Sequence, residues 1–238
     1  MQKVTFNFLI LVFGTLLFAP KNIFGNPSES ELIKADSLYE NKQYTEAIKI
    51  YEELFSDGYA SPNMLLKLAR VNEGSTNFGA TIFYLEKYYQ LTGDKRILEH
   101  IEKITSDNKI EGFSYELPFY ANYYYKSYSK FILLTLILIT VVFLAFWLQN
   151  KKERKGFATA AIFTLVLIAV VNNYHGQDYG IITDTPGFLM EGPSAGADVI
   201  TKLDQPTKLP LKGQVDIWTK TKVDDKEAYI KSEHLKKL

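Results

Sequence analysis

Residues Phe131 to Leu148 constrain this chain most, because they form a run of 18 residues without a charge or a proline. Fourteen of the 18 are Leu, Ile, Val or Phe, and each of these favours insertion at the bilayer centre by about 0.3–0.6 kcal/mol. A helix that is apolar on every side needs either lipid or a large apolar protein shell around it. The rest of this 238-residue chain offers little of that shell, so the run predicts a transmembrane helix over residues 131–149.

A second apolar run, Phe157 to Val171, begins shortly after the first one ends. At 1.5 Å per residue it would form a helix of about 22 Å, which is shorter than the roughly 30 Å of the hydrocarbon core. Long polar side chains at both ends of such a helix can reach the interface and close the difference. We therefore predict a second transmembrane helix over residues 157–174, antiparallel to the first because the connection is so short.

The connection between the two runs, residues 150–156, is strongly basic, whereas no Lys or Arg follows the second run until Lys202. Basic residues next to a membrane span favour the cytoplasmic side. We therefore expect the connection in the cytoplasm and both flanking segments in the periplasm, with the chain held in the bacterial cytoplasmic (inner) membrane. The residues that carry this prediction are Lys151, Lys152, Arg154 and Lys155.

The N-terminus independently predicts export. Lys3 precedes the apolar stretch Val4 to Phe18, and small and polar residues follow it, which is the pattern of a secretory signal sequence. We expect residues 1–25 to be this signal, with cleavage near Gly25, and an uncleaved anchor is the alternative. In either case the chain from residue 29 onward would lie outside the cytoplasm.

Two stretches within residues 29–106 resemble each other at offsets of 33 and 34 residues, which fits the period of a tetratricopeptide repeat. In such a repeat, small alanines let the two helices of a hairpin approach closely, while tyrosines fill the space against the next hairpin. A generic helical bundle is the alternative. The residues predicted to pack in this way are Ala35, Ala47, Tyr51, Ala69, Ala80 and Tyr84.

Residues 107–130 connect this helical segment to the first apolar run and are rich in tyrosine. Tyrosine rings favour the membrane–water interface. The segment is therefore either an interfacial aromatic belt or a plain linker.

From Tyr179 onward the pattern changes to short alternating stretches separated by Gly, Pro and Asp. This pattern predicts a small all-β barrel over residues 176–238. The segment resembles a bacterial SH3 domain, because Trp218 matches the aromatic residue before the family's fourth strand and Ala228-Tyr229-Ile230 matches its Gly-Trp-Ile. The resemblance implies a ligand surface near Trp218 and Tyr229.

The order of these segments carries a wider resemblance. The pattern AxxxYxxxxYxxAIxxYExL, then Ser61-Pro62-Asn63 and GATIFYLEKYYQLTGD, is similar to the aerotolerance-operon, BatE-type proteins. Those proteins combine a signal sequence, tetratricopeptide repeats, a pair of transmembrane helices and a C-terminal bacterial SH3 domain. The resemblance implies work in envelope stress tolerance with other membrane or periplasmic proteins, namely von Willebrand A-domain proteins and a MoxR-type ATPase system.

The stretch Gly192 to Gly196 reads GPSAG and matches the G-x-S-x-G pattern of many hydrolases. That motif needs a core strand before the serine, a helix after it, and a later acid and histidine held by a large α/β sheet. Here a proline precedes Ser194, and His234 is the one histidine that follows it. We therefore expect a loop at Ser194, with a hydrolase as a third hypothesis.

Composition argues against several other classes of protein. Lys plus Arg and Asp plus Glu number 27 each, so no net field attracts nucleic acid. The chain has no cysteine and three histidines, His100, His175 and His234, which disfavours disulfides and a zinc or histidine-rich metal site. At His175 and Asp178 a polar loop beside the membrane is expected. The sequence thus predicts no metal and no cofactor.

These inferences together predict a multidomain membrane protein with helical repeats, a two-helix transmembrane hairpin and a small β-barrel. The function that we expect is that of a non-enzymatic, membrane-anchored adaptor that presents protein-interaction modules outside the cytoplasm. The alternative is an anchor that binds cell-wall peptidoglycan through the SH3-like domain, since aromatic faces suit sugar and peptide contacts.

Overall fold

The computed structural model describes residues 29–149, 152–223 and 226–238. The predicted signal sequence, residues 1–25, lies outside the described residues, as does Lys151. Contacts divide the chain into two compact units. Of the described residues, one unit contains Leu117–Gly176, and the other contains residues 29–116 together with Gln177–Leu238.

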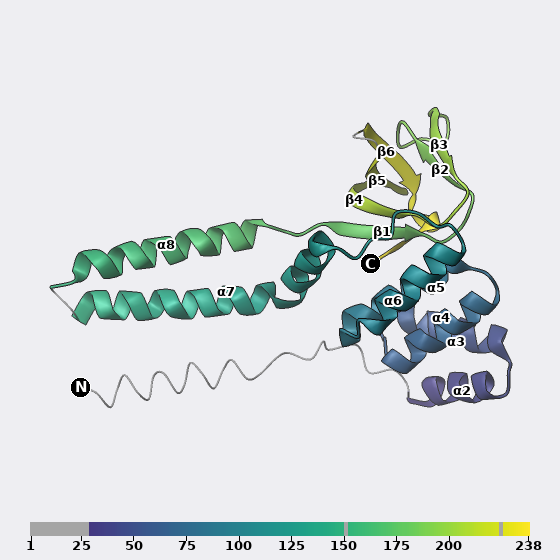
Figure 1. Cartoon of the computed structure of the whole chain (residues 1–238), viewed down its shortest axis with the longest axis horizontal. Coiled ribbons are helices and arrows are strands. Elements are labelled where there is room, and N and C mark those ends of the chain that lie inside the picture. The colour runs from purple at the N-terminus through teal and green to yellow at the C-terminus, as the bar shows by residue number, and fades with distance from the viewer. Residues whose placement is uncertain (1–28, 150–151, 224–225) are drawn as a thin grey trace. The chain divides into compact units, whose positions relative to one another are not determined.

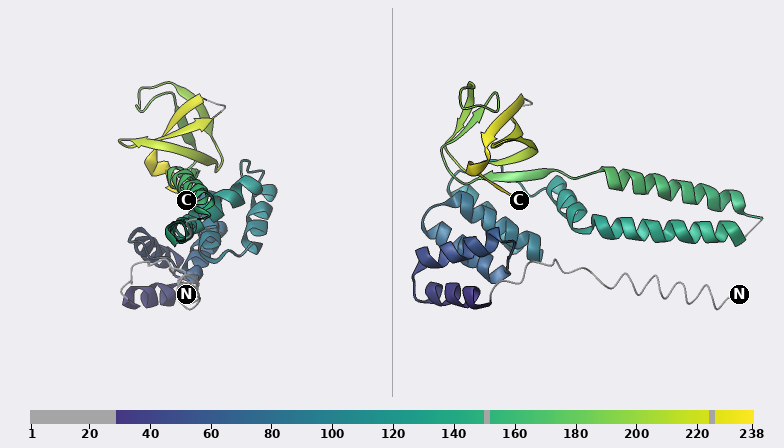
Figure 2. Two further views of the ribbon diagram at one scale, coloured as in Figure 1. Left: turned by 90° about the vertical axis from the view of Figure 1, so that its left-hand side faces the viewer. Right: turned by 180° about the vertical axis from the view of Figure 1, so that it is seen from behind.

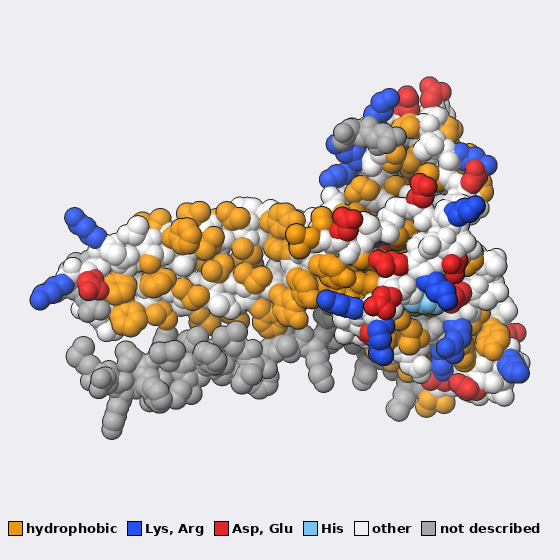
Figure 3. Space-filling view, viewed as in Figure 1, with side chains coloured by type: hydrophobic (Ala, Val, Ile, Leu, Met, Phe, Trp, Pro, Cys, Tyr) orange, Lys and Arg blue, Asp and Glu red, His pale blue; other side chains and the backbone are white. Residues whose placement is uncertain are grey.

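The unit Leu117–Gly176 is an antiparallel pair of helices, which lie side by side in every view (Figures 1 and 2). Helix α7 spans Leu117–Gln149 and helix α8 spans Arg154–Asn173. Both are long and apolar enough to cross a membrane, with mean hydropathies of 2.9 and 1.8 over their most apolar windows. Only 6% and 11% of those windows are buried, whereas the core helix of a globular protein is mostly buried. On the face drawn in Figure 3, hydrophobic side chains cover the length of both helices.

Helix α7 begins at Leu117, inside the segment 107–130 that the sequence marks as a linker. The tyrosines of that segment from Tyr120 onward are therefore helical, and α7 is 33 residues long. At 1.5 Å per residue this corresponds to about 50 Å, well beyond the roughly 30 Å of a hydrocarbon core.

Polar contacts join α7 to α8 near the middle of the pair and at the end of α8. Near the middle of the pair, the Oγ1 atoms of Thr140 and Thr164 are 2.8 Å apart and buried. At the end of α8, the Tyr125 hydroxyl donates to the carbonyl of Val171 at 2.7 Å, and its ring meets the edge of Tyr174 at a centroid distance of 4.6 Å.

The second unit begins with a row of antiparallel helices. Ser61 and Asn77 cap two of them by accepting hydrogen bonds from the backbone N–H groups of Met64 and Ala80. All six residues predicted to pack between the repeats are at most 3% exposed. The helices are α2 (Glu29–Glu40), α3 (Tyr44–Ser56), α4 (Pro62–Gly74), α5 (Phe78–Thr92) and α6 (Arg96–Asp107).

The turns show how the α2–α3 hairpin corresponds to the α4–α5 hairpin. Lys42 and Thr76, 34 residues apart, both follow a helix with φ near 60°, and the next helices begin at residues 44 and 78, again 34 apart. By helix position, Ala47 therefore corresponds to Thr81, which is fully buried. An alignment by sequence places Ala47 over Ala80 instead.

The unit continues with an antiparallel sheet ordered β3-β2-β6-β5-β4-β1-β7. The hydrophobic core on one face consists of Ile182, Leu189, Leu209, Ala228, Ile230 and Leu235. The strands are β1 (Asp178–Ile182), β2 (Gly187–Met190), β3 (Val199–Leu203), β4 (Lys208–Val215), β5 (Trp218–Val223), β6 (Lys226–Lys231) and β7 (Leu235–Lys237).

The predicted closure of this sheet into a barrel is wrong. Strands β3 and β7 are its two open edges. Strand β2 joins β6 through one residue pair, Met190 with Tyr229, and β7 is three residues long. Closing a barrel requires staggered pairing between the first and last strands, and edge strands this short do not provide it.

Helix α5 is buried along most of its length because it packs between its neighbouring helices and the sheet. At Gly79 the approach is so close that a Cβ atom would lie 2.8 Å from the carbonyl oxygen of Ile182 and 2.9 Å from the Cα of Thr183. The helical segment and the sheet, which the sequence treats as separate domains, thus lie against each other in one compact unit.

Candidate functional site

The two residues predicted to bind a ligand, Trp218 and Tyr229, lie on neighbouring strands. Tyr229 pairs with Lys220, which is two residues beyond Trp218, and alternate side chains on a strand share a face. The structure therefore brings Trp218 and Tyr229 to the same face of the sheet. Trp218 is only 6% exposed, so its ring offers little surface on which a ligand could stack.

Ser194 lies in the loop between β2 and β3, as expected. Its hydroxyl accepts a hydrogen bond from the N–H of Gly196 at 3.2 Å, and its own N–H donates to the carbonyl of Gly192 at 2.8 Å. His234 lies instead near Asp184, with 3.9 Å between Nδ1 and Oδ2. Within the described residues, no hydrogen bond joins Ser194 to a base.

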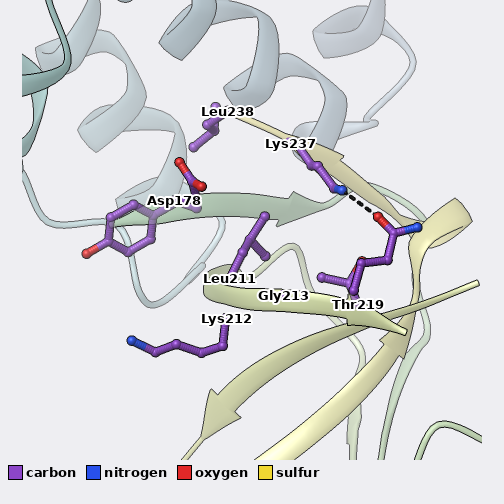
Figure 4. A pocket seen from close by; sticks show the side chains of 9 residues that line it. Asp178, Leu211, Lys212, Gly213, Thr219, Lys237 and Leu238 are labelled. Carbon is purple, nitrogen blue, oxygen red and sulfur yellow. Dashed lines mark hydrogen bonds between the residues drawn. The ribbon is translucent and has the colours of Figure 1, made fainter. Parts of the chain in front are cut away.

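A pocket of about 450 Å³ lies beside β1, β4, β5 and β7 (Figure 4). Two ammonium groups line it: Lys237 donates to Gln214 Oε1 at 2.9 Å, and Lys212 donates to Gln177 Oε1 at 2.9 Å. Both acceptors are neutral amide oxygens. The pocket also contains Asp178. The side chains of Lys212 and Lys237 point in different directions in Figure 4, so each ammonium group by itself would suit a small anionic group.

A buried ion pair joins the helical segment to the sheet. Glu86 of α5 accepts two hydrogen bonds from the ammonium group of Lys208 at the start of β4, at 2.7 and 2.8 Å. It also accepts one from the Tyr115 hydroxyl at 2.9 Å. The side chains of Glu86 and Lys208 are 2% and 9% exposed, and Lys208 lies 5.3 Å from the ring centroid of Tyr179.

A second polar contact crosses the same interface. Lys236 of β7 lies 2.9 Å from the Tyr84 hydroxyl oxygen and 3.2 Å from Glu52 Oε1, and the Tyr84 hydroxyl donates to Glu52 at 2.9 Å. Burial of Tyr84, followed by the negative charge of Glu52, raises the pKa of this phenol far above its ordinary value. Tyr84 therefore stays neutral and serves as a hydrogen-bond donor.

The first hairpin contains a similar arrangement. Tyr51 donates to Asp36, which also accepts a hydrogen bond from Lys67 of α4 at 2.9 Å. Burial, followed by the hydrogen bond to Asp36, raises the pKa of Tyr51. Tyr51 and Tyr84 were both predicted to pack between repeats. Each of them also donates a hydrogen bond to a carboxylate on another helix.

Sequence reasoning missed Glu86 and Lys208 because they are 122 residues apart. A carboxylate on a helix is usually solvated. The sequence does contain one sign that Glu86 is buried. The stretch GATIFYL directly before it is too apolar for an exposed helix face.

Three of the four predicted topology residues are described, and these lie where α7 joins α8. Lys152 and Lys155 are exposed there, and Arg154 begins α8. Among the described residues, no group of three or more His, Asp and Glu side chains is placed to hold a metal ion.

No protein-family model, curated protein or solved structure matches this chain significantly.

Proposed function

We propose that this protein is a non-enzymatic, membrane-anchored adaptor whose helical segment and sheet act together on one side of the membrane. The observation that carries the proposal is the ion pair between Glu86 and Lys208. These residues come before and after the α7–α8 pair in the chain. This contact supports a shared compartment for the two segments, which agrees with a hairpin that crosses the membrane twice.

The basic connection between α7 and α8 sets the proposed orientation. Its lysines and arginine favour the cytoplasm, and the N-terminal signal pattern favours export of the chain after it. The unit that contains the helical segment and the sheet would then face the periplasm, with α7 and α8 in the inner membrane.

The adaptor role rests on the kind of surface that remains available. The sheet contacts α3 and α5 through Glu52 and Glu86, while α2 and α4 expose the apolar residues Ile33 (61%) and Leu66 (36%). Rows of helices of this type bind partner segments on such a face. The similarity to BatE-type proteins supports von Willebrand A-domain proteins and a MoxR-type ATPase system as partners.

Single cysteines test the topology cleanly, because the natural chain has none. We would introduce Ser56→Cys at the end of α3, Ser194→Cys in the β2–β3 loop and Lys152→Cys in the basic connection, all at exposed positions. Intact spheroplasts would be treated with a membrane-impermeant maleimide. Ser56→Cys and Ser194→Cys should be labelled at once, and Lys152→Cys only after permeabilisation. Labelling of the first two from opposite sides would rule out the proposal.

The pocket in Figure 4 favours a second candidate function, the peptidoglycan anchor. The ammonium groups of Lys212 and Lys237 would suit the free carboxylates of peptidoglycan stem peptides. In this case the full-length protein should sediment with purified sacculi, and the double variant Lys212→Gln, Lys237→Gln should not. Equal sedimentation of both proteins would exclude this pocket as the binding site.

A further inference from the structure

A pocket of about 550 Å³ lies within the second unit, between the helical segment and loops of the sheet. The helical segment contributes the turn between α4 and α5 and the residues just after α6. The sheet contributes the β1–β2 loop and the β3–β4 loop. This pocket shares no residue with the pocket in Figure 4, and its volume is typical of a ligand site.

Backbone contacts hold the start of α5 against both loops. A Cβ atom on Gly79 would lie 2.9 Å from the Cα of Thr183 and 3.4 Å from the Cβ of Pro206. The N–H of Thr183 also donates to the carbonyl of His234 at 3.1 Å. These walls of the pocket are therefore in place without a ligand.

The pocket contains one carboxylate that is open to a ligand. Asp184 and Asp204 line the pocket, and none of the described residues in the lining is Lys, Arg or His. Asp204 is compensated by Lys202 at 2.7 Å. Asp184 Oδ2 lies 3.9 Å from Nδ1 of His234, which is too long for a hydrogen bond, and this Nδ1 has no hydrogen-bond partner among the described residues. The Asp184 side chain is 62% exposed, so a ligand can reach it from solvent.

Three further polar side chains in the lining have already donated protons to backbone carbonyls. The Ser75 hydroxyl donates to Asn72 at 3.0 Å, and the Thr76 hydroxyl donates to Ser75 at 2.7 Å. The amide Nδ2 of Asn108 donates to Ile104 at 2.9 Å. The side-chain oxygens of Ser75, Thr76 and Asn108 therefore remain as hydrogen-bond acceptors for a ligand.

The start of α5 opposes the charge of Asp184, because Phe78 and Gly79 also line the pocket. A helix N-terminus carries about half of a positive charge. Asn77 caps this end by accepting a hydrogen bond from the N–H of Ala80 at 3.1 Å. The full charge of the Asp184 carboxylate exceeds that of a capped helix end, so the pocket favours a cationic donor.

We propose that this pocket binds an arginine side chain of a partner protein. The guanidinium group donates to Asp184 and to acceptors in the turn between α4 and α5. Its five N–H donors match acceptors from several elements better than a compact ammonium group does. The methylene stem of the arginine lies along Phe78, Ile110 and Pro206, which are the larger apolar side chains in the lining. The assignment to a partner protein rests on the proposed adaptor function, and it specifies a basic segment as what the adaptor holds.

The test is binding of a capped amino acid, acetyl-arginine amide, to the full-length protein in a non-ionic detergent, measured by saturation-transfer NMR. The comparison is acetyl-citrulline amide, which has nearly the same shape and no charge. The natural protein should bind the arginine probe about tenfold more tightly, the factor expected for one hydrogen bond to a charged group. Equal binding of the two probes would overturn the proposal.

Asp184→Asn should abolish the preference for the arginine probe, and Asp184→Glu should keep it. Asp198→Asn is the matched control, because Asp198 is exposed in the β2–β3 loop and does not line the pocket. It should leave the preference unchanged. Equal losses in Asp184→Asn and Asp198→Asn would mean diffuse attraction and would contradict a specific site.

A second variant keeps the test decisive if circular dichroism shows that Asp184→Asn does not fold. Gln205 is exposed and lines the pocket, so Gln205→Lys places an ammonium group where it competes with the ligand for Asp184. This variant should also lose the preference for the arginine probe. An unchanged preference in a folded Gln205→Lys protein would count against the pocket.

Two competitors test whether the guanidinium comes from a protein. Millimolar calcium should not displace the capped arginine probe, and free L-arginine should bind no more tightly than that probe. Displacement by calcium would identify a metal site, and tenfold tighter binding of free L-arginine would identify a small-molecule site. Either result would overturn the assignment to a partner protein.

The cysteine labelling described above separates this inference from the proposed function. If the labelling follows the proposed topology and the arginine preference is absent, the pocket alone is contradicted. Labelling of Ser56→Cys and Ser194→Cys from opposite sides would contradict the proposed function, whatever the two probes show.

Discussion

At the scale of single residues, several helix ends are unusual because a residue other than glycine adopts positive φ, a backbone conformation that favours glycine. Helices α2, α3, α4 and α6 end in the same hydrogen-bond pattern, in which an N–H bonds to the carbonyl five residues earlier. The residue with positive φ in each pattern is Lys42, Gly58, Thr76 or Lys109. A β-branched residue such as Thr76, with φ 59°, is the most strained of these choices.

Replacing Thr76 with glycine should therefore stabilise the protein by about 1 kcal/mol, because the left-handed conformation costs other residues about 1–2 kcal/mol. Gly58→Ala is the matched control: nothing lies within 4 Å of the added Cβ, so its effect should be conformational and of opposite sign. Urea unfolding followed by Trp218 fluorescence, in a Trp147→Phe background, measures both. A Thr76→Gly variant less stable than the parent would contradict this account.

The buried tyrosines make a separate prediction about alkaline pH. The pKa of Tyr84 is raised in the folded protein, whereas in the unfolded chain it is about 10. The contribution of Tyr84 to stability is therefore complete below pH 10 and is lost as the pH rises above that value. In urea unfolding between pH 8 and 11, Tyr84→Phe should flatten the decline in stability. The exposed control Tyr124→Phe should follow the parent, and identical slopes for Tyr84→Phe and the parent would refute the prediction.

At the scale of elements, the pairing of α7 with α8 depends on a few polar contacts between apolar surfaces. If α7 and α8 lie in lipid, as proposed, lipid supplies little hydrophobic force between them, and packing and interhelical hydrogen bonds hold them together. The bond between Thr140 and Thr164 is one such contact, and the cap that Tyr125 places on the carbonyl of Val171 is another. The cap satisfies a carbonyl at a helix end, where no partner exists within the helix.

Tyr125→Phe keeps the ring contact with Tyr174 but removes the hydroxyl, and should therefore destabilise the pair by about 1 kcal/mol. Trp147 fluorescence during unfolding in mixed detergent micelles, in a Trp218→Phe background, reports on α7. Tyr128→Phe is the control, because the Tyr128 side chain is 52% exposed on the same helix. The cap has no role in stability if the two variants unfold alike.

At the scale of the whole molecule, the ion pair of Glu86 and Lys208 joins the helical segment before α7 to the sheet after α8. These two segments form one unit although the α7–α8 pair separates them in the chain. Removing one partner leaves the other charge buried and uncompensated, which costs about 3–5 kcal/mol. Replacing both by apolar residues of similar volume is often close to neutral. The pair therefore specifies the docking of the sheet more than it stabilises the fold.

Glu86→Gln and Lys208→Met should each destabilise the unit by about 3–5 kcal/mol, and Glu86→Met with Lys208→Met should recover much of that loss. Trp218 fluorescence during urea unfolding measures all three. The exposed pair Lys220 and Glu227, 2.7 Å apart, is the control, and its disruption should cost less than about 1 kcal/mol. Strict additivity of the two single changes would show that the side chains do not act as a pair.

The local parts of this structure were predictable and the long-range parts were not. The apolar runs at 131–148 and 157–171 lie in long helices, and the alternating stretches after Tyr179 form strands, because hydrophobic period reports on local conformation. The predicted barrel closure was wrong, since the edges β3 and β7 are decided by strand length and pairing. The burial of Trp218 was likewise outside the reach of a local pattern.

By itself, the sequence determined where lipid-compatible helices, packed helices and strands occur, because each of these depends on neighbours within a few residues. The tertiary structure decided that Glu86 meets Lys208, and that Tyr125 meets the carbonyl of Val171. Those contacts join residues 46 to 122 positions apart. Their formation depends on the direction in which whole helices and strands pack, which no short window of sequence contains.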